Sequence, residues 1–261
     1  MQTADQCLRD GDVEGARAAL TESIRSRPAD PEARMFFFQL LCLTGEWEKA
    51  RKQLETLARL SPEARMLSVV YGQAIAAEAV RAAVFAGDAD VSILAGGAWA
   101  QRLVAALRRR GQGNVAGART ARDEALDAAP DTPGEADGSR FDWIADADSR
   151  FGPTFEAVIG GRYGLVAFDA VSRIDAEGPR DLRDLVWSPV QIAFRQGHSA
   201  AALLPTRYPG SERSSDPAER LARSTGWSER GGEELGSGQH LWVLSNGEER
   251  GLLAVRSLAF D

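Results

Sequence analysis

The stretch Gly45–Pro62, GEWEKARKQLETLARLSP, has the pattern of an amphipathic helix that follows a glycine and stops at a proline. The same layout occurs at Gly11–Pro28, GDVEGARAALTESIRSRP, and at Gly113–Pro130, GNVAGARTARDEALDAAP. The three glycines lie 34 and then 68 residues apart, and each proline follows at the same offset. An alanine also recurs at one offset in each stretch: Ala16, Ala50 and Ala118. The chain therefore repeats a helical unit.

Each repeated position has a physical reason. Glycine adopts the left-handed conformation that ends one helix, and proline ends the next because it cannot donate to the hydrogen-bond ladder. The small alanine lets the two helices approach closely. A 34-residue period ending in proline is typical of the tetratricopeptide (TPR) repeat, a stacked helix–turn–helix unit.

One repeat of the series is irregular. Its turn should lie near residue 79, after a helix-like SVVYGQAIAAEAV, but the stretch 85–99, FAGDADVSILAGGAW, breaks the helical period with glycines and a short β-like run. We therefore expect roughly seven helices with one insertion. A TPR stack presents a groove lined by the first helix of each repeat, which suits an amphipathic helix. The expected groove residues are Met35, Gln39, Met66, Val69 and Gln73. For any single apolar residue of this set the core is the favoured position, because apolar stripes on helices usually face a core.

The second half of the chain has a different pattern. Residues 130–140, PDTPGEADGSR, are rich in Pro, Gly and Asp, which is typical of a boundary. Beyond them, Val-, Leu- and Phe-rich runs alternate with turn signals, including RQGH and SNGEERG, whose Asn-Gly pair suits a type I′ turn. The predicted fold is a multidomain α+β chain: a TPR-like α-helical solenoid over 1–130, a linker over 131–140, and a compact, mainly antiparallel β domain with one or two short helices over 141–261.

Composition narrows the function classes. Residues 1–130 carry 17 basic and 17 acidic side chains, so the whole net charge of −7 lies in the second half. This argues against nucleic acid or an anionic membrane as a partner, since both require a basic surface. The N-terminus has no secretory signal, and Cys7 and Cys42 lie in helix-like patterns, which favours a reducing cytoplasm.

The usual catalytic motifs are missing from the sequence. There is no G-x-x-x-x-G-K-[ST] loop, and GQGNVAG at Gly111 belongs to the helical repeat, so we expect no nucleotide cofactor. There is no G-x-S-x-G elbow, and the two histidines, His198 and His240, fall at a predicted turn and a predicted strand start.

The stretch 141–163, FDWIADADSRFGPTFEAVIGGRY, is the remaining candidate for chemistry. It gathers four carboxylates: Asp142, Asp146, Asp148 and Glu156. A calcium loop would need Gly and Glu where Phe151 and Ala157 stand, so the EF-hand interpretation fails. The favoured interpretation is a structural brace, in which Arg150 pairs with an Asp and aromatic residues anchor the domain junction. Those aromatic residues are Phe141, Trp143, Phe151 and Phe155. The alternative is a hydrolase or metal-dependent enzyme with a carboxylate site at the junction.

Four motifs of the second half, following a TPR-like first half, resemble the ImpE/TagJ family of type VI secretion accessory proteins. The motifs are DADSRFGPTFEAVIGGRY, LRDLVWSPVQ, LPTRYPGSE and RLARSTGW. Residues of these motifs that match the family pattern include Asp146, Asp148, Arg150, Glu156, Arg162, Tyr163, Trp187, Arg207 and Tyr208.

The resemblance implies a cytoplasmic, non-enzymatic protein without a cofactor or metal. Its implied partner is the small subunit of the contractile sheath, engaged through that subunit's N-terminal helical segment, with a link to the recycling ATPase. Assistance in sheath assembly or turnover is the implied role. A TPR scaffold for a different complex is a further hypothesis that the helical half alone leaves open.

Overall fold

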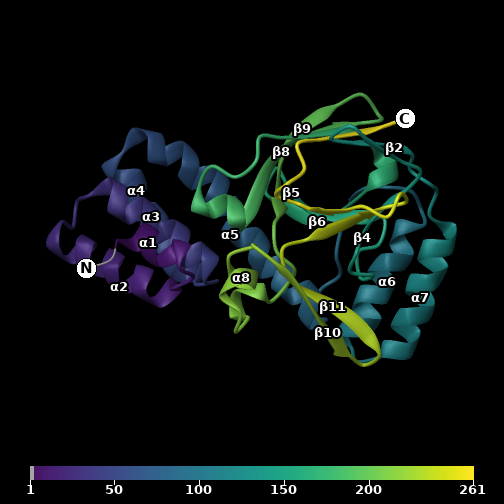
Figure 1. The fold of residues 1–261 in the computed structure, drawn as a ribbon, viewed down its shortest axis with the longest axis horizontal. Helices are drawn as coiled ribbons and strands as arrows, with labels where there is room; N and C mark the ends of the chain where they lie inside the picture. Colours follow the sequence, from purple (N-terminus) through teal and green to yellow (C-terminus); the bar gives the residue numbers. More distant parts are fainter. Residues whose placement is uncertain (1–2) are drawn as a thin grey trace.

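The computed structural model, which describes residues 3–261, has a helical end and a sheet end joined by a long central helix (Figure 1). The predicted α+β architecture is confirmed: N-terminal helices are followed by a mainly antiparallel sheet domain. The elements of the first half are α1 (Ala4–Arg9), α2 (Val13–Ser26), α3 (Pro31–Leu43), α4 (Trp47–Leu60), α5 (Pro62–Ala86), β1 (Ile93–Ala95), α6 (Ala100–Gly111) and α7 (Val115–Ala128).

Glycines and polar caps set the helix boundaries as the repeat predicts. Gly11, Gly45 and Gly113 have φ angles of 81°, 70° and 79°, the left-handed region that glycine adopts without a Cβ clash. The side chains of Asp30 and Ser61 accept hydrogen bonds from the first turns of α3 and α5, each of which begins with proline. Local sequence therefore fixes these helix ends.

Helix α5 departs from the predicted repeat. The expected turn near residue 79 is absent, and α5 runs without a break for 25 residues to Ala86. Its interior holds many alanines and one glycine, Gly72, and has no proline after Pro62, so nothing stops the helix. By length and hydropathy α5 is also the one described helix that would suffice to cross a bilayer, yet it carries Glu78 and Arg81 buried against the sheet domain.

The sheet domain is built from a nine-stranded sheet in the described chain, with the strand order β1-β6-β5-β9-β8-β7-β14-β2-β3. A three-stranded sheet, β13-β12-β4, and the hairpin β10–β11 complete it. The strands are β2 (Gly134–Ala136), β3 (Ser139–Phe141), β4 (Ile144–Asp146), β5 (Thr154–Ile159), β6 (Arg162–Ala167), β7 (Val171–Ala176), β8 (Trp187–Phe194), β9 (Ser199–Pro205), β10 (Thr225–Arg230), β11 (Glu233–Gly238), β12 (Leu241–Leu244), β13 (Glu249–Gly251) and β14 (Ser257–Phe260). Short helices are η1 (Phe168–Ala170), η2 (Leu182–Leu185), η3 (Ser211–Arg213) and α8 (Pro217–Arg220).

Two segments outside the expected β domain also join the sheet. Strand β1, from the irregular insertion of the helical half, pairs in parallel with β6 at one edge. Strands β2 and β3 overlap the expected linker 131–140 and lie at the opposite edge, where β2 pairs with β14 and β3 pairs with β2. A run rich in Gly and Asp can still form short edge strands, because it is the partner strand that supplies the order.

The SNGEERG turn differs from the expected type I′ turn. Among the described non-glycine residues only Asp137 and Ala222 have positive φ, so Asn246 does not adopt the conformation that type I′ needs. Instead Gly247 has a φ of 85°, and its backbone N–H donates to the carbonyl of Leu244. This is the pattern of a type I turn closed by a left-handed glycine. Gly197 closes the turn between β8 and β9 in the same way, with a positive φ and a backbone N–H that donates to the carbonyl of Phe194.

A shared apolar core joins the helical end to the sheet domain. Trp187, at the start of β8, is fully buried and packs its ring 5.6 Å from that of Trp47 and 6.0 Å from that of Tyr71. Phe151 packs against Phe85 of α5 with ring centres 5.7 Å apart. Trp143, expected in this junction, is instead 41% exposed, because alternation along the short strand β4 turns Ile144 inward and its neighbour outward.

Candidate functional site

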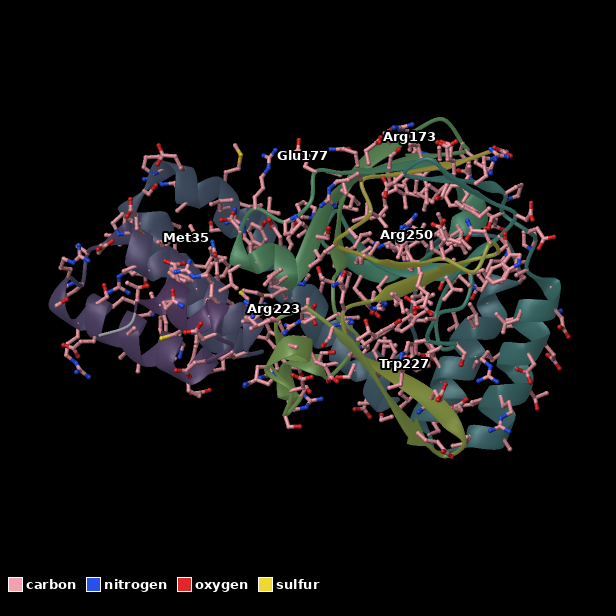
Figure 2. The ribbon with its side chains drawn as sticks, in the orientation of Figure 1. Met35, Arg173, Glu177, Arg223, Trp227 and Arg250 are labelled. Carbon is pink, nitrogen blue, oxygen red and sulfur yellow. The ribbon has the colours of Figure 1, made fainter. Side chains whose placement is uncertain are left out.

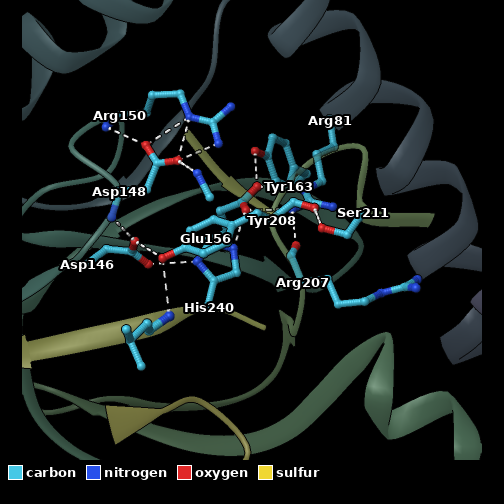
Figure 3. Close-up of polar contacts among 12 residues, drawn as sticks. Arg81, Asp146, Asp148, Arg150, Glu156, Tyr163, Arg207, Tyr208, Ser211 and His240 are labelled. Carbon is cyan, nitrogen blue, oxygen red and sulfur yellow. Dashed lines mark hydrogen bonds and ion pairs between the residues drawn. The ribbon is translucent and has the colours of Figure 1, made fainter. Parts of the chain in front are cut away.

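The carboxylate of Glu156 is the centre of a buried polar network beneath helix α5 (Figure 3). Strand β5 carries Glu156 under α5, where Arg81 donates from Nε to Oε1 and from Nη2 to Oε2, both over 2.7 Å. The Tyr163 hydroxyl, on neighbouring strand β6, donates to Oε1 over 2.6 Å. A bidentate guanidinium–carboxylate pair of this kind fixes orientation as well as distance.

His240 connects Glu156 to Asp146. Its Nε2 lies 2.9 Å from Glu156 Oε2, and its Nδ1 lies 2.7 Å from Asp146 Oδ2. Both ring nitrogens therefore face carboxylates, an arrangement in which the doubly protonated imidazolium can donate twice. The ring is buried and lies edge-on to Phe151, with centres 5.1 Å apart.

Charge pairing decides the ionisation of this network. Burial opposes the charged form of His240, but the Asp146 and Glu156 carboxylates prevail and raise its pKa to about 9. Burial likewise opposes ionisation of Glu156, yet the Arg81 guanidinium and its hydrogen bonds hold the pKa of this carboxyl well below its ordinary value. At neutral pH the Arg81 guanidinium, the Glu156 carboxylate and the His240 imidazolium therefore alternate in charge, whereas burial raises the pKa of Asp146 above its ordinary value against the attraction of His240.

Asp146 and Asp148 extend the network toward the β10–β11 hairpin. Asp146 Oδ1 accepts from the Tyr208 hydroxyl over 2.7 Å and from the Asp148 backbone over 2.8 Å. Asp148 accepts from the Arg150 side chain and from the backbone N–H of Gly236 over 2.8 Å. A Cβ on Gly236 would approach the Tyr208 ring to 2.4 Å, so only glycine fits there.

The network also reaches the N-terminal helices. Trp187 Nε1 donates to Glu78 over 2.9 Å, and Glu78 in turn faces Arg81. Arg207 is buried and donates to the carbonyl of Leu43, at the end of α3, over 3.0 Å. Cations that donate to the last carbonyls of a helix cap its C-terminus.

Of the nine family-motif positions, seven are buried in or beside this network, and Arg150 is partly buried. Arg162 is exposed at the β5–β6 turn. Of the four carboxylates expected together, Asp142 is exposed and stands apart from the other three.

The network has little capacity for chemistry as it stands. Every carboxylate oxygen of Asp146 and Glu156 already accepts at least one hydrogen bond from a side chain. Among residues 3–261, no group of three or more His, Cys, Asp or Glu is placed to hold a metal ion. A polar cleft of about 1200 Å³ lies above it, lined by Glu78 and Arg81 among others, but the two acids beneath are sealed from it. The contacts are those of a brace between helix and sheet.

The five expected groove residues are divided by the structure. Met35 lies on α3 beneath the η2 segment, whose Arg183 contacts the Met35 sulfur at 4.0 Å, and Gln39 is buried. Met66, Val69 and Gln73 are exposed on α5. The concave side of α3 is thus covered by the chain itself, whereas the α5 residues remain accessible.

A second cleft, of about 620 Å³, opens beside the accessible residues of α5. Met66 and Gln73 form one wall, and the opposite wall comes from η2 and from strands β8 and β9. Exposed apolar surface beside a preformed cleft is a common feature of protein interaction sites.

Sequence reasoning missed two members of the buried network, Arg81 and His240. Arg81 stands 75 residues before Glu156, and His240 stands 84 residues after it, so no local pattern links them. A signal was present in the charge of Glu78 and Arg81 within an otherwise uncharged run of α5. Charges in such a run are either exposed or paired inside the protein.

Comparison with known proteins extends over the whole chain. Residues 138–259 match the domain family described as ImpE protein, and residues 8–70 match a tetratricopeptide repeat. The chain is 39% identical over 259 residues to a Pseudomonas aeruginosa PAO1 protein named type VI secretion system accessory component TagJ. That match covers 99% of this chain and 91% of the relative.

A solved structure has the same fold. The crystal structure of protein VPA1032 from Vibrio parahaemolyticus superposes with a TM-score of 0.88, covering 99% of this chain and 97% of the other. The two are 22% identical, so this likeness concerns the fold.

Proposed function

Because the chain belongs to the ImpE/TagJ family of type VI secretion accessory components, we propose that it is a non-catalytic binding protein for the sheath. Its proposed partner is the small subunit of the contractile sheath, engaged through that subunit's N-terminal helical segment. The binding would assist sheath assembly or turnover in the cytoplasm, in connection with the recycling ATPase.

One observation carries this proposal: the face of α5 that is free to meet a partner is apolar and exposed, and it borders a cleft. Met66 lines that cleft and is 77% exposed, and Val69, three residues further along the helix, is 62% exposed. Apolar side chains in such a groove are the usual receptors for an amphipathic helix. The buried network, in contrast, offers no open catalytic group, which supports binding over turnover.

Titration calorimetry of the full chain with a peptide of the sheath small subunit's N-terminal helix tests the proposal. Binding with a Kd of tens of micromolar or tighter is expected, because a short amphipathic helix buries only a modest area. A scrambled peptide of the same composition is the control and should not bind.

The absence of heat at those concentrations, with both components shown to be folded and with the whole sheath subunit equally inert, would contradict the proposal. A scrambled peptide that binds as well as the native one would contradict it too, since the contact would then be non-specific.

A further inference from the structure

The outward face of helix α5 carries an uncharged row of four apolar residues and one glutamine along much of its length. We call this row the α5 stripe: Met66, Val69, Gln73, Ala76 and Val80. All five are exposed, Met66 and Val80 at 77% and 48%. From Met66 onward every exposed residue of α5 is uncharged.

Helix α5 differs from an ordinary surface helix because both its buried side and its exposed side are largely apolar. Glu78 and Arg81, its only charged residues beyond Arg65, point inward and pair within the buried network. A helix on a protein surface normally buries its apolar side and exposes its charges. Helix α5 thus pairs its charges internally and leaves an uncharged side exposed for another molecule.

The spacing of the stripe indicates what kind of molecule fits. Its members are separated alternately by three and four residues, the a and d positions of a heptad. The adjoining flank positions hold Val70, Gly72 and Ala79, which carry no charge and let a second helix approach closely. An α-helix with its own heptad-spaced apolar residues is the matching shape.

The neighbouring sheet face widens this surface. Helix α5 covers the β5 and β6 side of the face through contacts of Ala77 and Val84 with Val158 and Leu165. The adjoining strands on the same face leave Asp175, Pro189, Gln191 and Ala201 exposed. These four are neighbours in register: Asp175 lies opposite Gln191, and Gln191 lies opposite Ala201. The cleft of about 620 Å³ runs between this open face and α5.

The charge on the far wall of the cleft indicates which charge the side of a partner helix should carry. Four carboxylates line the cleft (Asp175, Glu177, Asp181 and Asp184) against two guanidinium groups, those of Arg180 and Arg183. Both arginines are already paired, Arg180 with Glu177 and Arg183 with Asp181. In Figure 2, Glu177 lies between Met35 on the helices and Arg173 on the sheet, at the side where the two parts meet. Asp175 is paired in the same way with Arg173, and Asp184 is buried and accepts from the backbone N–H groups of Arg180 and Asp181. The wall therefore keeps a small excess of negative charge, of four carboxylates over three guanidinium groups.

We propose that the α5 stripe and the cleft beside it are the docking site for an amphipathic partner helix with heptad-spaced apolar residues and a basic flank. The helix lies along α5, with its basic flank toward Asp175 and Glu177. This inference rests on the proposed function, because the helix is taken to be that of the sheath small subunit. The proposed docking site differs from the concave TPR groove, which η2 already occupies.

Calorimetry with the sheath small subunit and three variants of the full chain tests the site. Val69→Arg and Val80→Arg place a charge on the stripe, at side chains exposed enough to leave the fold intact. Leu126→Arg, on α7 and 38% exposed, is the matched control for adding a charge at an exposed apolar residue. The two stripe variants should weaken Kd by about tenfold or more, while the control stays within about twofold.

A fourth variant, Glu177→Arg, tests the charge of the far wall. It should weaken binding several-fold and reduce the loss of affinity on adding salt, since it removes an attraction that salt screens. Circular dichroism and thermal melting of each variant confirm that the fold is retained.

The outcomes separate the site from the function. If the wild-type chain binds the sheath subunit and both stripe variants bind equally well, the site is wrong and the proposed function stands. If the wild-type chain does not bind, both the site and the proposed function are wrong.

Two further measurements test for other occupants of the stripe. Sedimentation that shows a wild-type dimer lost in Val69→Arg would assign the stripe to a second copy. Co-sedimentation with phosphatidylcholine vesicles lost in the same variant would assign it to a lipid surface. Either result overturns the inference.

Discussion

Glu156 is the residue on which the junction between helix and sheet depends. Its two oxygens accept from Arg81, Tyr163 and His240, so it joins three chain segments that are far apart in sequence. A buried carboxylate with this many donors is stable as an anion, but the stability is lost if its cation is removed.

Replacing Arg81 by Met should therefore destabilise the protein strongly. The variant leaves Glu156 charged and buried without its main partner, which typically costs about 3–5 kcal/mol in the free energy of unfolding. Urea denaturation followed by tryptophan fluorescence measures this. Arg51→Ala, which breaks exposed pairs with Glu48 and Glu55, is the control and should leave the midpoint unchanged. Equal midpoints for the two variants would mean that the network does not brace the fold.

The imidazolium of His240 predicts how stability varies with pH. Its pKa is raised to about 9 in the folded protein, above the unfolded value of about 6.5. The extra stability is fully present below pH 6.5 and is lost as the pH rises through 9, a decrease on the order of 3 kcal/mol. Urea denaturation at several pH values between these limits tests the slope.

The histidine variants identify the group responsible for that slope. His240→Gln should flatten it, whereas His198→Gln, at an exposed turn, should keep it. Stability that rises with pH over this range in both the wild-type chain and His198→Gln would show that His240 is neutral in the folded state.

At this scale the sequence revealed only the local part of the network. The pairing of Arg150 with Asp148 was predictable because the two residues are neighbours and a loop can bring them together. The convergence of Arg81 and His240 on Glu156 was not, because it requires strands β5 and β12 and helix α5 to be placed first. Burial of these charges follows from tertiary packing, which residue spacing does not encode.

At the scale of elements, Gly113 and Gly72 allow backbone strain and helix propensity to be measured separately. Gly113 has a left-handed φ of 79° and Gly72 lies inside α5, and at both a Cβ would meet nothing within 4 Å. Gly113→Ala should destabilise by about 1–2 kcal/mol through backbone strain alone. Gly72→Ala should stabilise by up to about 1 kcal/mol through helix propensity. Thermal melting compares them.

Shifts of the same sign in these two alanine variants would contradict the assignment of Gly113 to a helix end or of Gly72 to a continuous helix.

The elements were predictable wherever a local signal decides them. The recurring glycines and prolines predict the ends of α2, α4 and α7. Helix α5 was expected to break because the repeat period was extended across a run that contains no helix breaker. Strands β2 and β3 were expected to be linker, because edge strands of three residues take their order from the partner strand.

At the scale of the whole molecule, the two halves interlock. Arg207 caps α3 and Arg223 donates to the Leu8 and Arg9 carbonyls at the end of α1, so the sheet domain closes helix ends of the other half. Trp187 enters the core of those helices. The change of residue pattern along the sequence does not predict this contact between the two halves. The sequence therefore predicts a partner in the concave groove, where η2 lies in the structure.

Methionine methyl NMR tests the central claim most directly, because the chain has only three methionines. Met66 lies on the α5 stripe, Met35 lies beneath η2, and Met1 is outside the described residues. With ¹³C-labelled methyl groups assigned by Met→Leu variants, saturating sheath small subunit should shift or broaden the Met66 signal and leave Met35 unchanged. An unchanged Met66 signal when calorimetry shows binding, or a change confined to Met35, would contradict the account.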